Sequence, residues 1–377
     1  MSLRTRVARG SSRRRLATAG VLATVLTVTA CGGGDGGGGG SEAEGETYEW
    51  NFADYSAPTN VTAKAMVDWA ANLEELTDGR VKIKFFYSES LLKAQEIMPG
   101  VGDGRADLGY MAAQYHASEL PLSQITGVPF LNDNAERGAR TFQDLYENNE
   151  ALQEEWNKQG VHIISPVFTP NAIVVSKKPV ESLDDFRGTK VRTLGYQAEA
   201  FKQIGATPVG IPQPEVYTSL ERGVLDMASG TTLDLAASLG FEEVTDYYIG
   251  IPTGQYVIAA NVMNLELWES LPQDIKDAID EANEQYMTDV IERLTAREAE
   301  ACEQATSASV EMIMLGEDVA EEWESAVGDS VLDIWTKDAT DAGAADPAAF
   351  AEDYEAALGE HEDGLSYEDG MKQCAQG

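Results

Sequence analysis

Short apolar runs alternate with segments of helical spacing through most of the chain after Thr47, and this alternation constrains the fold more than any other feature. The runs at 48–53, 81–86 and 106–111 have the pattern of strands. The segments at 59–76 and 91–98 lie between them and have helical spacing. Strands separated by helices of this length form parallel βαβ units, so the sequence predicts an α/β fold.

A second group of strand-like runs follows at 172–175, 190–192, 208–211 and 225–228. Two groups without an internal sequence repeat suggest two lobes. Pro170 interrupts the pattern near residue 168, and another strand-like run starts at Tyr256, so we expect the chain to pass between the lobes more than once. Such crossings form a hinged cleft. The predicted division is 47–168 plus 256–297 for lobe I, and 169–255 plus 298–377 for lobe II.

A long helix is predicted after the capping-box sequence Ser270-Leu-Pro-Gln273. Apolar residues then recur every three or four positions up to Leu294, and neither Gly nor Pro occurs between Pro272 and Gly316. A helix of about 35 residues would be about 50 Å long, enough to cross both lobes. Polar residues at 306–309 weaken the pattern, so two helices that break near Ser307 remain an alternative.

The N-terminus has the features of an export signal. Residues 1–30 combine an arginine-rich start with an uncharged, mostly apolar run, which is typical of a secretory signal peptide. Small residues directly before Cys31 look like a bacterial lipobox, so Cys31 is expected to carry a lipid; an ordinary cleaved signal is the alternative. The Gly-rich segment 31–46 is typical of a flexible tether. These features place the globular part on the extracytoplasmic face of a bacterial membrane.

Acidic residues dominate the charge. The chain has 64 acidic and 27 basic residues and a net charge of −37, which disfavours binding to nucleic acids. We interpret this charge as a solvated acidic surface suited to a salty habitat. An anionic ligand would meet net repulsion, so its site must supply positive charge locally.

Two of the three cysteines, Cys302 and Cys374, lie in the exported part. An oxidising compartment favours a disulfide between them, and two unpaired thiols are the alternative. The three histidines are far apart in the sequence and show no zinc-ligand spacing, so we expect neither a metal nor a cofactor.

The segment 178–226 indicates where a ligand could bind. Ser182 has the position of an N-cap, and Gly188 can end the short helix that follows. The next predicted strand, 190–192, ends at Arg192. Ligands bind at the carboxyl ends of strands in open α/β sheets, and a guanidinium matches a carboxylate in shape and charge. Arg192 is therefore the first candidate for ligand binding.

This segment resembles the solute-binding proteins of TRAP transporters, the DctP-like family. The similarity is carried by Leu183-Asp-Asp-Phe-Arg-Gly-Thr-Lys-Val-Arg192, Gly205-Ala-Thr-Pro-Val209, Glu215-Val-Tyr-Thr-Ser-Leu220 and Gly223-Val-Leu-Asp226. The resemblance implies a two-lobe, type II-like periplasmic-binding-protein fold with a cleft and a domain-crossing helix. It also implies that Arg192 binds the carboxylate of a ligand.

Three positions depart from the usual family pattern. Asn171 stands where a second arginine is common, and Gln213 replaces an aromatic residue. Gly230, followed by Thr231 and Thr232, replaces an asparagine. The pocket should therefore be less cationic than usual, which favours a monocarboxylate with additional polar groups. The other candidates face the presumed cleft, where each could equally serve packing: Tyr55, Tyr110, Gln114, Tyr115 and Phe168.

No nucleophile elbow, His-Glu-x-x-His motif or Walker loop occurs, so we do not expect an enzyme. The sequence predicts a lipid-anchored binding protein that delivers an organic acid to TRAP-type membrane subunits, and we expect it to be a monomer. A binding lipoprotein of an ABC importer or a sensor system is the main alternative, and a purely structural lipoprotein is a more distant one.

Overall fold

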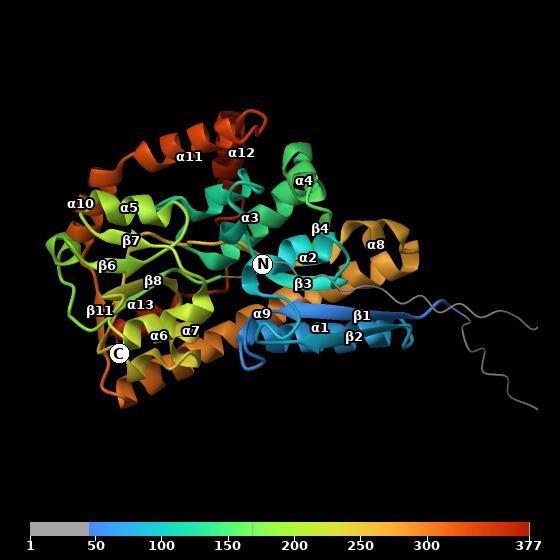
Figure 1. Cartoon of the computed structure of the whole chain (residues 1–377), viewed down its shortest axis with the longest axis horizontal. Coiled ribbons are helices and arrows are strands. Elements are labelled where there is room, and N and C mark those ends of the chain that lie inside the picture. The colour runs from blue at the N-terminus through green and yellow to red at the C-terminus, as the bar shows by residue number, and fades with distance from the viewer. Residues whose placement is uncertain (1–44, 168, 377) are drawn as a thin grey trace, which may run out of the picture. The chain divides into compact units, whose positions relative to one another are not determined.

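The computed structural model describes residues 45–167 and 169–376, and the strands within them form two sheets (Figure 1). Sheet A has the order β2-β1-β3-β10-β4. Its strands are β1 (Tyr48–Asp54), β2 (Val81–Phe86), β3 (Leu108–Ala112), β4 (Val161–Val167) and β10 (Ala259–Asn264). Strands β1, β2 and β3 are parallel, whereas β10 is antiparallel to both of its neighbours.

Sheet B has the order β11-β9-β5-β8-β6-β7. Its strands are β5 (Ile173–Ser176), β6 (Lys190–Arg192), β7 (Thr207–Val209), β8 (Met227–Thr231), β9 (Tyr247–Gly250) and β11 (Glu311–Met314). Here β5 is antiparallel to β8 and β9, and the other pairs are parallel. In each sheet the antiparallel strand, β5 or β10, directly follows a connection from the other sheet. The predicted α/β fold with two groups of strands is confirmed.

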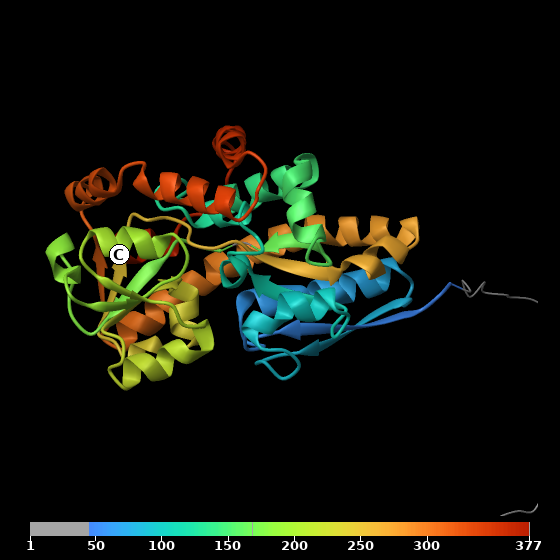
Figure 2. The same cartoon turned by 45° about the horizontal axis from the view of Figure 1, so that its top comes forward.

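The predicted long helix is a single helix, α9 (Gln273–Ser307, 35 residues), so the alternative of two helices is wrong. Its buried positions form one stripe from Ile275 to Ala305. Helix α1 (Val61–Leu76), beside sheet A, packs on α9, and so does α7 (Leu233–Ser238), beside sheet B. The helix therefore runs past both sheets (Figures 1 and 2).

The predicted capping box of this helix is wrong. Helix α9 begins after Pro272, which provides no side-chain cap. Ser270 instead ends the preceding helix α8 (Leu265–Ser270), where its hydroxyl donates to the carbonyl oxygen of Leu267 at 2.7 Å.

Four helices after β11 complete the described chain: α10 (Glu317–Val327), α11 (Ser330–Asp341), α12 (Pro347–Glu360) and α13 (Gly370–Gln376). Helix α10 contacts α5 (Gln197–Gln203) on the side of sheet B, whereas α12 contacts α3 (Ala135–Asn148) on the side of sheet A (Figure 2). The segment predicted to belong to lobe II thus contacts helices beside both sheets. The remaining α-helices are α2 (Ile97–Gly102), α4 (Glu150–Asn157) and α6 (Val216–Glu221). Short 3-10 helices occupy Ala94–Glu96, Ala113–His116, Ser123–Gly127, Leu183–Phe186, Gln213–Glu215 and Phe241–Glu243.

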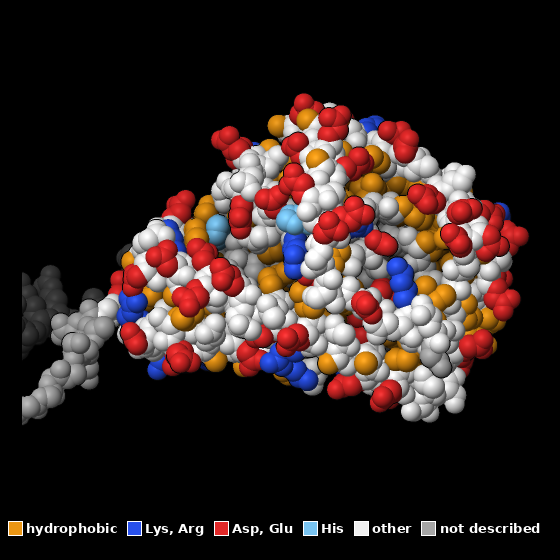
Figure 3. Space-filling view, turned by 180° about the vertical axis from the view of Figure 1, so that it is seen from behind, with side chains coloured by type: hydrophobic (Ala, Val, Ile, Leu, Met, Phe, Trp, Pro, Cys, Tyr) orange, Lys and Arg blue, Asp and Glu red, His pale blue; other side chains and the backbone are white. Residues whose placement is uncertain are grey.

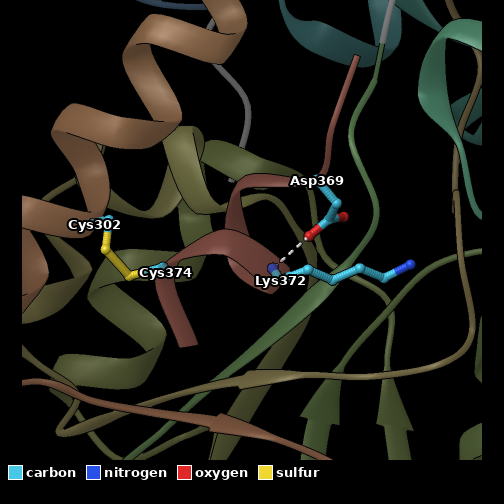
Figure 4. The surroundings of a disulfide bond; sticks show 4 residues. All are labelled: Cys302, Asp369, Lys372 and Cys374. Carbon is cyan, nitrogen blue, oxygen red and sulfur yellow. Dashed lines mark hydrogen bonds between the residues drawn. A yellow bond between two sulfur atoms is a disulfide. The ribbon is translucent and has the colours of Figure 1, made fainter. Parts of the chain in front are cut away.

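The last of these helices is joined covalently to α9. Cys302 in α9 and Cys374 in α13 form a disulfide, with their Cα atoms 5.6 Å apart (Figure 4). Buried Glu298, one turn before Cys302, accepts hydrogen bonds from the Tyr367 hydroxyl at 2.9 Å and the Gly370 N–H at 3.2 Å. The C-terminal segment is thus fastened to α9 by a covalent bond and by buried hydrogen bonds.

Acidic side chains are spread over the face seen in Figure 3, with few basic ones between them. Between residues 45 and 376, leaving out residue 168, no helix is long and apolar enough to cross a bilayer. The predicted signal peptide 1–30, Cys31, the tether up to residue 44 and Phe168 lie outside the described residues.

Candidate functional site

A cavity of about 80 Å³ is lined by residues from the strand ends and loops of both sheets. From the side of sheet A come Tyr55, Asn60, Thr62, Tyr110, Tyr115 and Ala259. From the side of sheet B come Arg192, Leu194, Gln213, Gly230, Thr232 and Asp234. The connections between the sheets contribute Thr169, Pro170, Tyr256 and Val257, and α9 contributes Leu294. The cavity therefore lies where the two halves of the described chain meet.

The local structure that delivers Arg192 follows the prediction. Ser182 and Asp185 form a capping box at the 3-10 helix Leu183–Phe186, and Gly188 has a φ of +74°. The following strand β6 lies between β7 and β8, with Arg192 opposite Val209 and Ala228. Arg192 is thus at the end of an interior strand of sheet B.

Backbone carbonyl groups hold the guanidinium of Arg192, which is only 2% exposed. Its Nε donates to the carbonyl oxygen of Ile211 at 3.1 Å. Its Nη1 donates to the carbonyl oxygens of Ser229 at 3.2 Å and Gly230 at 2.5 Å. No hydrogen bond or ion pair within the described residues uses Nη2 of Arg192. A buried cation without an acidic partner, placed on a cavity, is suited to an anionic ligand.

Gly230 makes room for this arrangement. Its φ of +65° lies in the left-handed region, which residues with a side chain rarely adopt. A Cβ atom at Gly230 would also be only 2.8 Å from Nη1 of Arg192. A residue with a side chain at position 230 would therefore displace the guanidinium of Arg192.

Four tyrosines surround the cavity. The rings of Tyr55 and Tyr110 stack with centroids 5.2 Å apart, and Tyr115 meets Tyr55 edge-on at 6.1 Å. Tyr256 enters from the connection between β9 and β10. Burial raises the pKa of Tyr55, Tyr110 and Tyr256 above the ordinary tyrosine value. These phenols are therefore neutral at physiological pH and can donate hydrogen bonds to a ligand.

One hydrogen bond links the two sides of the cavity directly. The backbone N–H of Gln213, on the side of sheet B, donates to the hydroxyl of Tyr115, on the side of sheet A, at 3.1 Å. The side-chain Nε2 of Gln213 is buried and has no partner among the described residues. This amide is therefore a candidate to donate to a ligand.

Asp234 is an acidic residue on the same cavity, in the first turn of α7. The hydroxyl of Thr232 donates to its Oδ1 at 2.5 Å. Burial raises the pKa of the Asp234 carboxyl, while the Thr232 hydroxyl and the Leu235 backbone act in the opposite direction. Sequence analysis missed both Asp234 and Tyr256. An acid in a first helical turn has an ordinary explanation in the helix dipole, and a tyrosine at a strand start has one in packing.

A second carboxyl, that of Asp54, is buried close enough to Tyr55 and Tyr110 to raise the pKa of both phenols. Asp54 at the end of β1 is 3% exposed, and its Oδ1 accepts from the Ser56 N–H and hydroxyl, both at 2.7 Å. Burial raises the pKa of Asp54 to about 6, and the hydrogen bonds from Ser56 oppose this rise.

The structure brings together five of the predicted site residues: Arg192, Gln213, Tyr55, Tyr110 and Tyr115. Asn171 and Thr231 do not line this cavity. The Nδ2 of Asn171 donates to the carbonyl oxygen of Asp133 at 2.6 Å and to Oδ2 of Asp369 at 2.8 Å, so it holds the C-terminal segment. Thr231 is buried at the end of β8, and its neighbour Thr232 reaches the cavity instead. In the described part of the chain, no cluster of three or more His, Cys, Asp or Glu side chains could hold a metal ion.

The two-sheet fold with a cavity between the sheets is compatible with a binding protein for a small molecule. The sequence profile of the DctP family, bacterial extracellular solute-binding protein family 7, matches residues 52–338, and the chain belongs to this family. Members of this family are solute-binding proteins that act outside the cytoplasm.

Individual relatives are distant. The chain is 23% identical to the outer membrane transporter protein TsaT of Comamonas testosteroni over 338 residues. This alignment covers 88% of this chain and 94% of TsaT. It is 23% identical over 294 residues to the ectoine-binding periplasmic protein TeaA of Halomonas elongata, covering 76% of this chain and 83% of TeaA. A TRAP solute-binding protein from an unidentified marine microbe, crystallised with 3-hydroxybenzoate, has the same fold: the TM-score is 0.76 at 22% identity, over 85% of this chain and 100% of that protein.

Proposed function

We propose that this solute-binding protein captures an organic acid in the cavity between the two sheets and that Arg192 binds its carboxylate. The observation that carries the proposal is the buried guanidinium, which lines the cavity and has no acidic partner among the described residues. The 3-hydroxybenzoate in a structure of the same fold and the ectoine-binding activity of TeaA support a carboxylate ligand.

The ligand carries a single carboxylate in this proposal. Among the described residues that line the cavity, Arg192 is the only Lys or Arg, and Asp234 adds a negative charge. A second carboxylate would therefore meet repulsion without a second cation to offset it. Neutral tyrosine hydroxyls and the Gln213 amide supply hydrogen bonds to the remaining polar groups of the ligand.

The protein hands its ligand to TRAP-type membrane subunits in this proposal, and the two sides of the cavity close over the ligand by hinge motion. The two lobes predicted from the sequence would move relative to each other. Lobe I consists of 47–168 plus 256–297, and lobe II of 169–255 plus 298–377. Closure expels water, which strengthens the contacts of Arg192 with the ligand. The family match favours this function over an ABC importer or a sensor. We also propose that Cys31 carries the lipid anchor, that the protein is a monomer, and that it catalyses no reaction on its ligand.

Titration calorimetry and thermal unfolding with a panel of mono- and dicarboxylates test the proposal. We expect one or more monocarboxylates to raise the melting temperature of the wild type and to bind at least about tenfold more weakly to Arg192→Ala. Equal affinities of the two proteins would reject Arg192 as the carboxylate site, and stabilisation by dicarboxylates alone would reject the single carboxylate. Mass spectrometry of the membrane-bound protein tests the lipid on Cys31.

A further inference from the structure

Two side chains of opposite charge line the same cavity, and neither has an ionic partner in the described part of the chain. Arg192 comes from β6 and Asp234 from the start of α7. Throughout residues 45–167 and 169–376, no ion pair includes either side chain, so the two do not neutralise each other. A buried charge without a partner is unfavourable, and a ligand that supplies the opposite charge relieves that cost.

The groups around Asp234 leave part of its carboxylate open. Thr232 donates one hydrogen bond to Oδ1, at 2.5 Å, and the backbone N–H of Leu235 adds support. A carboxylate has about four acceptor positions, so these donors do not fill it. Arg297, whose positive charge lowers the pKa of Asp234, forms its own ion pair with Glu300 at 3.4 Å. Asp234 lines the cavity, so a ligand bound there can donate to the acceptor positions that these donors leave unfilled.

Tyr256 lines the same cavity and is influenced by the charges of both Arg192 and Asp234. Burial has the largest effect on the pKa of Tyr256 and raises it. The positive charge of Arg192 lowers this pKa, whereas the negative charge of Asp234 raises it. One phenol therefore lies within electrostatic range of both side chains. Arg192, Asp234 and Tyr256 all line the same cavity, so one small molecule bound there is exposed to both charged side chains.

We propose that the ligand is a small zwitterion whose carboxylate binds Arg192 and whose protonated nitrogen binds Asp234. This inference rests on the proposed function and narrows its ligand class. A simple monocarboxylate would leave Asp234 without a partner, and a dicarboxylate would bring a second negative charge toward it. The neighbouring rings of Tyr55, Tyr110 and Tyr115 suit the same ligand, because aromatic faces attract cations.

Matched ring compounds test this proposal. Piperidine-2-, -3- and -4-carboxylate carry a protonated ring nitrogen at three distances from the carboxylate, whereas cyclohexanecarboxylate has nearly the same size without the cation. Titration calorimetry on the wild-type protein is expected to give at least one piperidine acid an affinity at least about tenfold higher than cyclohexanecarboxylate. An equal or higher affinity for cyclohexanecarboxylate than for all three piperidine acids would overturn the proposal.

Two variants locate the effect. Asp234→Asn keeps an oxygen that can accept from Thr232 but removes the charge, so it should abolish the preference for the zwitterion. Asp226→Asn is the matched control: Asp226 is exposed, does not line the cavity, and accepts a hydrogen bond from the Lys190 N–H at 2.8 Å. It removes the same charge from the same half of the protein and should keep the preference. A preference that survives in Asp234→Asn would overturn the proposal.

The outcomes separate the two proposals. If cyclohexanecarboxylate binds in a way that depends on Arg192 and the piperidine acids have no advantage, the zwitterion is rejected and the organic-acid function stands. If none of the four compounds binds, the zwitterion is also rejected, and the wider carboxylate panel decides on the function. If Asp234→Asn does not fold, the comparison of the four compounds on the wild type still decides.

Discussion

Arg192 and Gly230 fit each other: Nη1 of Arg192 donates to the carbonyl oxygen of Gly230 at 2.5 Å, and the missing side chain of Gly230 leaves space for that nitrogen. A strand end in β8 thereby orients a cation that comes from the neighbouring strand β6. The orientation of Arg192 should therefore depend on a residue that needs no direct contact with the ligand.

We expect Gly230→Ala to weaken binding of the ligand at least about tenfold, because the new Cβ would lie 2.8 Å from Nη1 and displace the guanidinium. It should also lower the free energy of unfolding by roughly 1 kcal/mol, because alanine is strained at positive φ. Calorimetric titration and urea unfolding measure the two effects. Gly223→Ala is the matched control, because Gly223 has a φ of +68° and a Cβ atom there would meet no other atom within 4 Å. If both variants lose the same affinity, backbone strain and not the contact with Arg192 is responsible.

Arg192→Ala should reduce stability as well as binding, because it leaves the buried carbonyl oxygens of Ser229 and Gly230 without their donor. We expect a loss of about 1–3 kcal/mol in the free energy of unfolding without ligand. Sequence analysis identified Arg192 only as a candidate for ligand binding, since the backbone partners of its guanidinium are not visible in the sequence. Arg192→Lys should restore little of the binding, because an ammonium cannot replace the fixed fork of donors.

Arg187→Ala is the control for that measurement. Arg187 is in the same segment, but its side chain is 68% exposed and pairs with Asp184. Its removal should leave the affinity for the ligand unchanged. The free energy of unfolding should change by no more than about 0.5 kcal/mol. An equal loss of affinity in Arg187→Ala would point to a general effect of net charge.

The pH dependence of stability should contain a contribution from Asp54. Burial raises the pKa of Asp54 from 3.8 to about 6 in the folded protein. Between these values the folded protein binds more protons than the unfolded chain, so this contribution to stability falls as the pH rises through the window. Asp54→Asn has no carboxyl to titrate at this position. Between pH 4 and pH 7 the free energy of unfolding of the wild type should therefore fall by about 2–3 kcal/mol more than that of the variant. Urea unfolding across this range measures the difference, and parallel pH profiles of the two proteins would contradict the assignment.

Loss of the disulfide should destabilise the fold without affecting the cavity. Cys302 and Cys374 are 72 residues apart, and losing a cross-link that closes a loop of this length costs about 4 kcal/mol in the entropic account. We expect Cys302→Ser to unfold at lower urea concentration and to bind its ligand with unchanged affinity. Reductant should shift the wild type to the same midpoint and leave the variant where it is. The cross-link would be contradicted if the wild type had the same urea midpoint as Cys302→Ser and if reductant did not shift that midpoint.

The sequence predicted those elements whose signals are local. The capped turn before Lys190, the left-handed Gly188 and the strand that ends at Arg192 depend on neighbouring residues, and they appear as expected. Strand β11 was not foreseen, since its four residues at the sheet edge do not alternate between buried and exposed positions. The run expected to start at Tyr256 forms a strand only from Ala259, because the preceding residues serve as the connection that lines the cavity.

The composition of the site was less predictable, because it depends on contacts between distant residues. Asn171 was aligned with a ligand-binding position, but its partner Asp369 lies 198 positions further along the chain. Asp234 and Tyr256 reach the cavity only because the ends of both sheets meet there. Neither relationship leaves a periodic or local pattern in the sequence.

The cross-link between Cys302 and Cys374 has a practical consequence for recombinant production. In a reducing cytosol only packing and hydrogen bonds would hold the last helix to α9, and preparations from that compartment should be more sensitive to proteases at their C-terminal end. Secretion into an oxidising compartment should therefore yield the more homogeneous sample for crystallisation.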